Sequence, residues 1–170
     1  MIRRFAALLA LVVLAACSKP DLPSSVVRAG SEEELAASRA ELAERFGAAA
    51  LASFDVAIQE LQLAGMDRGL RTAAERSAAM REAVNGKTVR AVEILGWQAR
   101  RERLLAECAS LEPTLAQDLK TQAAKGADTP LVVRNRIQNV QDILAKTRRL
   151  ADEADEKLAA WRKSPQSSGP

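Results

Sequence analysis

Apolar residues recur at helical spacing through most of this 170-residue chain, and the pattern predicts an all-α protein. The longest pattern lies near the carboxyl terminus, where apolar or small residues alternate four and three positions apart for more than three heptads. This seam consists of Val133, Ile137, Val140, Leu144, Thr147, Ala151, Ala154, Leu158 and Trp161. A seam of this length requires a partner helix, because a lone helix cannot bury its own apolar stripe.

The preceding long helix is the expected partner. It follows Asn85-Gly86-Lys87-Thr88, where Gly86 suits the left-handed position after a helix end and Thr88 can cap the next helix. A kink or restart is expected at Pro113, and Thr129-Pro130 is expected to open the last helix. The short loop at residues 125–128 favours an antiparallel hairpin within one chain. A coiled coil between two chains is the alternative interpretation.

Shorter amphipathic helices are predicted before this hairpin. Ser31-Glu32-Glu33-Glu34 reads as a capping box that opens a helix reaching Phe46, with a bend expected at Gly47. The next two helices carry apolar faces formed by Leu51, Phe54, Ile58 and Leu61, and by Leu70, Ala73, Ser77, Met80 and Val84. The predicted architecture is therefore short amino-terminal helices packed on a long antiparallel helical hairpin.

The amino terminus has the pattern of an export signal. Arg3 and Arg4 precede an apolar run that is too short to span a bilayer, and small residues follow it. The sequence Leu14-Ala15-Ala16-Cys17 resembles the bacterial lipobox, which implies cleavage before Cys17 and attachment of lipid to the Cys17 thiol. Two or three acyl chains, palmitate among them, would hold the mature protein stably at a membrane.

Four segments follow from these patterns. Residues 1–16 are predicted to be a signal peptide, and residues 17–30, with their prolines and serines, a lipidated flexible tether. Residues 31–163 are predicted to form one helical domain, and residues 164–170 a disordered tail. Ser18 follows the lipidated position, where an aspartate would indicate retention in the inner membrane. The expected location is therefore the outer membrane, with the body facing the periplasm.

The middle of the chain resembles a group of small Gram-negative lipoproteins that are defined only by a domain of unknown function. The resemblance covers residues 31–107 and rests on three features. These are Ser31-Glu32-Glu33, the trio Phe54, Ala57 and Ile58, and Asn85-Gly86-Lys87-Thr88. It implies a compact helical domain and a lipoprotein of the cell envelope, and it implies no enzymatic activity.

Composition and charge narrow the possible chemistry. The chain has no histidine, which removes the commonest general base and the commonest metal ligand. The formal charge of +3 includes Arg3 and Arg4, so loss of the signal would leave +1 with acids and bases interleaved. No nucleic-acid partner, metal or cofactor is predicted.

Several candidate residues have simpler structural explanations. Cys108 would be the only thiol left after lipidation, so we expect it to be buried rather than paired. The run Arg100-Arg101-Glu102-Arg103 is expected to form a solvated helix face, with contact to anionic lipid as the alternative. Trp97 and Trp161 are expected at the seam or its rim rather than as a ligand-stacking pair.

The sequence thus predicts a membrane-anchored periplasmic lipoprotein that is not an enzyme. Binding or scaffolding at the cell envelope, through a protein partner that the sequence does not name, is the expected role. An adaptor built on an intermolecular coiled coil is the alternative, followed by an enzyme whose site has no familiar motif. Cys17 is the one predicted site residue, as the lipid attachment point.

Overall fold

The structure is a computed structural model that describes residues 21–163, and within this range it is helical. The predicted all-α class is confirmed. One antiparallel bridge, between Val26 and Thr88, is the only β pairing among these residues. In chain order the elements are the 3-10 turn η1 (Leu22–Ser24), α1 (Glu32–Phe46), the 3-10 turn η2 (Ala48–Leu51), α2 (Ala52–Asp67), α3 (Ala73–Val84), α4 (Val89–Lys125), the 3-10 turn η3 (Gly126–Asp128) and α5 (Leu131–Lys163).

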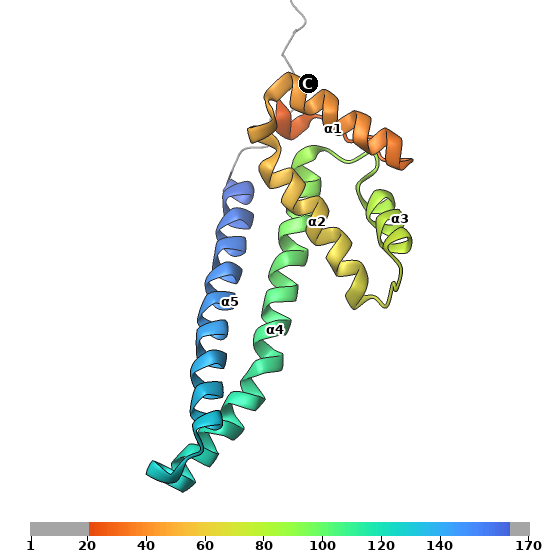
Figure 1. The fold of residues 1–170 in the computed structure, drawn as a ribbon. Coiled ribbons are helices and arrows are strands. Elements are labelled where there is room, and N and C mark those ends of the chain that lie inside the picture. Colours follow the sequence, from red (N-terminus) through yellow and green to blue (C-terminus); the bar gives the residue numbers. More distant parts are fainter. Residues whose placement is uncertain (1–20, 164–170) are drawn as a thin grey trace, which may run out of the picture.

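Helices α4 and α5 form the long antiparallel hairpin that the sequence predicts (Figure 1). Trp97 of α4 packs with Ala154 and Leu158 of α5, and Cys108 packs with Val140 and Leu144. The buried positions of the α5 seam are Ile137, Val140, Leu144, Thr147, Ala151, Ala154 and Leu158. Since the chain's own α4 covers the seam, an intermolecular coiled coil loses its main support.

The shorter elements gather at one end of the hairpin (Figure 1). We call this end, residues 21–106 and 149–163, the proximal end, and we call residues 107–148 the distal hairpin. Helix α2 crosses α4 so closely at Gly96 that a Cβ there would lie 2.3 Å from the Cα of Ala57. The core of the proximal end consists of Val27, Ala29, Leu42, Leu51, Phe54, Ala57, Met80, Val84, Val89 and Val92.

Most helix boundaries follow the predicted signals. The hydroxyl oxygens of Ser31 and Thr88 each accept a backbone N–H three residues on, which caps α1 and α4. Gly47 has a φ of +87° and separates α1 from η2, so the chain breaks here instead of bending within one helix. The reciprocal capping box lies elsewhere, at the start of α3, where the side chains of Thr72 and Glu75 each accept a backbone N–H.

Pro113 neither ends nor restarts α4, which runs continuously for 37 residues. Its side chain is exposed, so the ring points away from the contact with α5. The hairpin turn is closed by Thr129, whose hydroxyl donates a hydrogen bond of 2.6 Å to the carbonyl oxygen of Gly126. Helix α5 begins at Leu131, one residue after Pro130, which the sequence predicts to be its first residue.

Residues 21–30 are part of the folded body, which corrects the prediction that residues 17–30 form a flexible tether. The side chains of Val27 and Ala29 are buried in the core. The Val27 N–H donates to the Lys87 carbonyl oxygen at 2.8 Å, and the Gly86 N–H donates to the Val27 carbonyl oxygen at 2.9 Å. Residues 17–20, like the predicted signal peptide at 1–16 and the predicted tail at 164–170, lie outside the described residues.

Candidate functional site

The predicted lipidation site, Cys17, also lies outside the described residues, so it stays a prediction. Asp21, the first described residue, is four positions after it. Within residues 21–163, no helix is long and apolar enough to cross a bilayer. A lipid attached to Cys17 would lie close in sequence to Val27, whose backbone forms hydrogen bonds with the Asn85-Gly86-Lys87-Thr88 turn.

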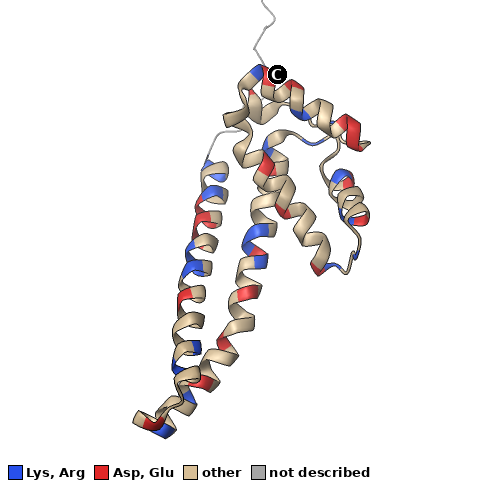
Figure 2. Cartoon of the chain, viewed as in Figure 1, with Lys and Arg blue, Asp and Glu red and all other residues tan. Residues whose placement is uncertain are grey.

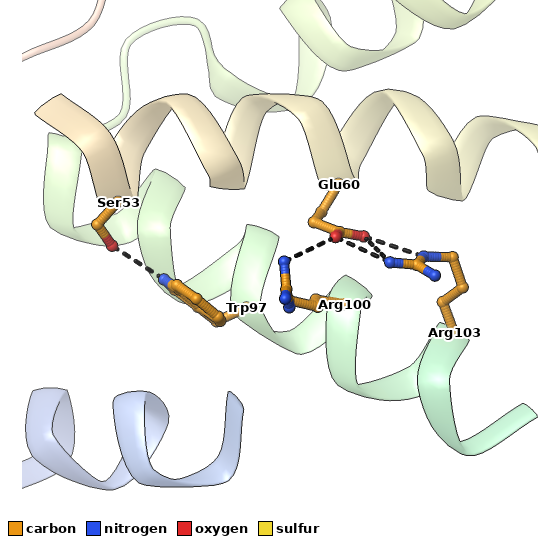
Figure 3. A network of polar contacts seen from close by, with 5 residues as sticks. All are labelled: Ser53, Glu60, Trp97, Arg100 and Arg103. Carbon is orange, nitrogen blue, oxygen red and sulfur yellow. Dashed lines mark hydrogen bonds and ion pairs between the residues drawn. The ribbon is translucent and has the colours of Figure 1, made fainter. Parts of the chain in front are cut away.

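Two arginines of the basic run at residues 100–103, Arg100 and Arg103, belong to an ion-pair network between α2 and α4, which corrects the predicted solvated face for these two residues. Glu60 of α2 is only 5% exposed, and both of its carboxylate oxygens accept hydrogen bonds from arginines of α4 (Figure 3). Arg103 donates from Nε at 3.0 Å and from Nη2 at 2.9 Å, and Arg100 donates from Nη1 at 3.3 Å. Arg101 instead reaches the surface carboxylate of Asp155 on α5 at 2.6 Å.

This network aligns α2 with α4. A buried carboxylate that loses its guanidinium partners costs several kcal/mol, so the two helices are held in the register in which all three groups meet. The Arg100 guanidinium also lies 5.3 Å from the ring centroid of Trp97. Trp97 in turn donates from its indole N–H to the Ser53 hydroxyl at 3.0 Å (Figure 3). Trp97 is therefore the seam residue that the sequence predicts, with its polar atom satisfied by α2.

A pocket of about 380 Å³ opens beside this network at the proximal end. It is formed where four parts of the chain meet, namely η1, the junction of η2 and α2, the start of α4 and the end of α5. Its floor and walls combine apolar side chains with one carboxylate, one ammonium and one hydroxyl. The lining residues are Leu22, Pro23, Ala50, Ser53, Val89, Glu93, Lys157, Ala160 and Trp161.

Glu93 is the buried carboxylate of this pocket. Its residue is 4% exposed. Burial raises the pKa of the Glu93 carboxyl above its ordinary value of 4.5, while a hydrogen bond with Ser53 and the positive charge of Lys157 act in the opposite direction. Among the described residues, no lysine or arginine forms an ion pair with Glu93. The pocket therefore holds a carboxylate that is desolvated without a direct counter-ion.

Arg90 holds Trp161, which forms one wall of the pocket, in place. Its guanidinium lies 5.4 Å from the ring centroid of Trp161 and donates a hydrogen bond to the Trp161 carbonyl oxygen. This contact ties the last turn of α5 to the first turn of α4. Trp161 is half-buried at the rim of the hairpin, as predicted, and it presents aromatic surface to the pocket.

The remaining sequence candidates serve the fold. Cys108 is buried, as predicted, against Val140 and Leu144. In the amino-terminal acidic run, the Glu34 carboxylate accepts the Gly30 N–H at 3.0 Å. Within residues 21–163, the structure brings no set of histidine, cysteine or acidic side chains together at spacing that could hold a metal ion. Acidic and basic residues are interleaved along α4 and α5 (Figure 2).

Three buried carboxylates were not predicted, although each carries a sequence signal. Glu60 follows Leu51, Phe54 and Ala57 at intervals of three, and Glu93 lies four residues from both Val89 and Trp97. Asp118 continues the spacing of four and three that runs along α4 through Cys108, Leu111 and Leu115. An acid on an apolar face was the common signal. In the distal hairpin, Asp118 is held by Arg136 of α5, whose Nε donates at 2.5 Å.

No protein-family model, no curated protein and no solved structure matches this chain.

Proposed function

We propose that this chain is a lipid-anchored, non-enzymatic arm of the bacterial cell envelope, attached through Cys17 to the outer membrane and binding a periplasmic protein with its distal hairpin. The observation that carries the proposal is that the two ends of the fold differ in their distance from the residues next to Cys17. The segment that follows Cys17 packs at the proximal end, whereas the turn between α4 and α5 lies at the opposite end of the molecule (Figure 1).

The dimensions of the molecule suit a spacer. Four residue steps separate Cys17 from Asp21, and an extended chain of that length spans at most about 14 Å. Because residues 21–30 are packed, the body would be held close to the membrane. Helix α4 has 37 residues, so it is about 55 Å long. An arm of this length would carry the distal hairpin well into the periplasm.

The distal hairpin also carries exposed apolar side chains that a partner could cover. Leu131 and Val132, beside the turn, are 66% and 67% exposed, and Leu119 and Ile143 are exposed as well. A groove of about 410 Å³ lies between α4 and α5 in this region, with the Glu112–Arg148 ion pair among its lining residues. Exposed apolar side chains that gather in one region of a protein can mark a protein–protein contact.

The absence of histidine from the sequence and the structural roles of most charged clusters support a non-enzymatic function. The lipobox and the resemblance to small envelope lipoproteins support the location. Both lines of support come from the sequence, and the fold adds the separation between the anchored segment and the exposed distal surface.

Site-specific photocrosslinking in intact cells tests the distal binding surface. A photoreactive residue at Leu131 should capture one discrete partner, since this side chain is exposed next to the turn. The matched control is the same residue at Met66, which is 57% exposed at the proximal end and should not capture that partner. Equal capture at both positions, or capture only at Met66, would contradict the proposal.

A separate experiment tests the anchor. Cys17→Ala should abolish incorporation of labelled palmitate and release the protein from the membrane fraction, because the thiol is the attachment point in a lipobox. Cys108→Ala is the control, because its buried thiol should contribute nothing to labelling. Labelled palmitate in the Cys17→Ala protein would show that the lipobox interpretation is wrong.

A further inference from the structure

The pocket around Glu93 has features that the fold does not require. A buried carboxylate normally has a guanidinium or ammonium partner, as Glu60 and Asp118 do in this molecule. Glu93 has a hydroxyl at Ser53 and, farther off, the charge of Lys157. Leaving a carboxylate desolvated in this way destabilises the folded chain. A ligand that brings a positive charge to Glu93 would supply the missing partner.

Charge varies with depth in the pocket. Glu93 lies buried at its base, whereas Lys157 is exposed on α5 at its edge. A simple amine would therefore find its counter-ion at the base but pass a like charge at the entrance. A ligand with an ammonium at its inner end and a carboxylate at its outer end would meet an opposite charge at both positions.

The walls of the pocket set a third requirement for the ligand, in addition to its ammonium and its carboxylate. Leu22, Pro23 and the ring of Trp161 line the same pocket and present apolar surface to it. The pocket volume of about 380 Å³ falls in the range of small-molecule sites. This volume suits a small molecule with a side chain of moderate size rather than a polymeric ligand.

We propose that this pocket binds a small zwitterion with an apolar side chain, the chemistry of a free apolar amino acid, with its ammonium at Glu93 and its carboxylate at Lys157. The Ser53 hydroxyl shares the Glu93 carboxylate with the ligand ammonium, and Trp161 covers the ligand side chain. Arg90 keeps the wall in place through its contact with Trp161. This site is at the proximal end, so it is independent of the proposed partner surface on the distal hairpin.

Direct titration of the purified full-length chain tests the proposal. The probes are L-leucine, L-methionine and L-phenylalanine, with binding measured by calorimetry and by tryptophan fluorescence, to which Trp97 and Trp161 both contribute. Two truncated probes separate the charges: 3-methylbutylamine is leucine without its carboxylate, and 4-methylpentanoate is leucine without its ammonium. At least one of the three amino acids should bind at millimolar concentration or below. For leucine, each truncated probe should bind at least tenfold more weakly.

Three variants assign the contacts. Glu93→Gln keeps the shape of the side chain and should weaken amino-acid binding at least tenfold. Lys157→Gln should weaken binding of the amino acid but leave binding of 3-methylbutylamine undiminished. Glu156→Gln changes an exposed neighbour on α5 and should leave binding unchanged. Unfolding curves of all three variants establish that they remain folded.

The remaining outcomes overturn the proposal. It is wrong if none of the three amino acids binds, or if binding is the same in Glu93→Gln as in the unchanged chain. It is equally wrong if 3-methylbutylamine binds as tightly as leucine, because Lys157 would then have no ligand carboxylate to hold. Loss of binding would leave the distal surface intact, so crosslinking at Leu131 tests the proposed function separately.

Discussion

The two ends of this molecule bury their apolar residues in different ways. At the proximal end, the side chains of Val27, Leu51, Phe54 and Val89 come from three separate stretches of chain and are almost completely buried. The distal hairpin consists of α4 and α5 with the short η3 turn between them, and its apolar core lies along the stripe where the two helices touch. Leu131 and Val132 lie outside that stripe and face solvent.

This difference follows from the number of layers. A helix that is covered on two sides buries most of its apolar surface, whereas each helix of an isolated pair buries one stripe. The distal hairpin therefore has less apolar burial per residue to offset the entropy of ordering its chain. We expect it to open locally before the proximal end does.

The largest effect is expected at Phe54, in the centre of the proximal core. Phe54→Ala should lower the free energy of unfolding by about 3–5 kcal/mol, because it removes a fully buried ring and leaves a cavity between α2 and α4. Urea unfolding followed by circular dichroism measures the change. Gln59→Ala, at an exposed position of the same helix, should change the free energy by no more than about 0.5 kcal/mol. Similar losses in both variants would contradict the assigned core.

A smaller loss is expected at Leu144, in the seam of the distal hairpin. Leu144→Ala should cost about 2 kcal/mol, the lower end for a buried leucine, since neighbours on a two-helix seam can move into the space. The control, Gln138→Ala on an exposed face of α5, should cost no more than about 0.5 kcal/mol.

The same unfolding curves test whether the hairpin is intramolecular. A hairpin within one chain has an unfolding midpoint that is independent of protein concentration, whereas an obligate dimer unfolds later as concentration rises. We expect no dependence for the unchanged chain or for Leu144→Ala. A midpoint that rises with concentration would restore the intermolecular coiled coil as the better interpretation.

The sequence predicts the distal hairpin better than the proximal end, and the reason is the range of the contacts. The α5 seam repeats a local pattern over more than three heptads, so its burial could be predicted from spacing alone. Burial of Val27 could not, because it depends on hydrogen bonds to Gly86 and Lys87, some sixty residues later. The signals in residues 17–30 were proline and serine, which also occur in packed segments.

For charged residues, too, the sequence shows the local neighbours but not the partners that lie far away along the chain. Arg100 and Arg103 lie beside Glu102 and Glu107 in the sequence, and this local mixture indicates an exposed face. Their actual partner is Glu60, forty residues earlier in the chain. The Glu93 pocket was not predicted either, because its walls come from four parts of the chain that only the fold brings together.

The ion pair of the distal hairpin between the buried Asp118 and Arg136 should make the stability of the hairpin depend on pH. The hydrogen bonds from Arg136, reinforced by its charge, lower the pKa of the Asp118 carboxyl below its ordinary value of 3.8. The unfolded chain therefore takes up the proton first as pH falls. The contribution of Asp118 is fully present at pH above about 5, and it is lost as pH falls through the lowered pKa.

Asp118→Asn should accordingly be less stable than the unchanged chain at pH 7, and the difference should shrink as pH falls below 4. Thermal unfolding across pH 3–7 measures both midpoints. Asp152→Asn, an exposed acid on α5, should show a much smaller difference at every pH. A constant gap between Asp118→Asn and the unchanged chain would mean that packing, rather than the ion pair, accounts for the loss.

The smallest effect on the stability of the folded chain is expected at Glu93. Its sign is opposite to that at Asp118, because the Glu93 carboxylate destabilises the folded chain. Burial raises the pKa of this carboxyl above 4.5, so the folded chain holds the proton more tightly than the unfolded chain. The penalty is absent below about pH 4, where Glu93 is neutral in both states. It grows as pH rises from 4.5 through the raised pKa and is constant above it. Ser53 and Lys157 offset part of the cost, so the effect should be smaller than at Asp118.

Glu93→Gln should therefore be more stable than the unchanged chain at pH 8, and the two should converge near pH 4. Thermal unfolding without ligand measures the difference, and Glu102→Gln on the exposed side of α4 should show little change. A less stable Glu93→Gln at pH 8 would mean that the carboxylate has a strong partner within the fold. Opposite pH trends at Asp118 and Glu93 would distinguish a buried carboxylate that has its counter-ion from one that lacks it. The second kind, at the proximal end, is the one that a ligand ammonium would stabilise.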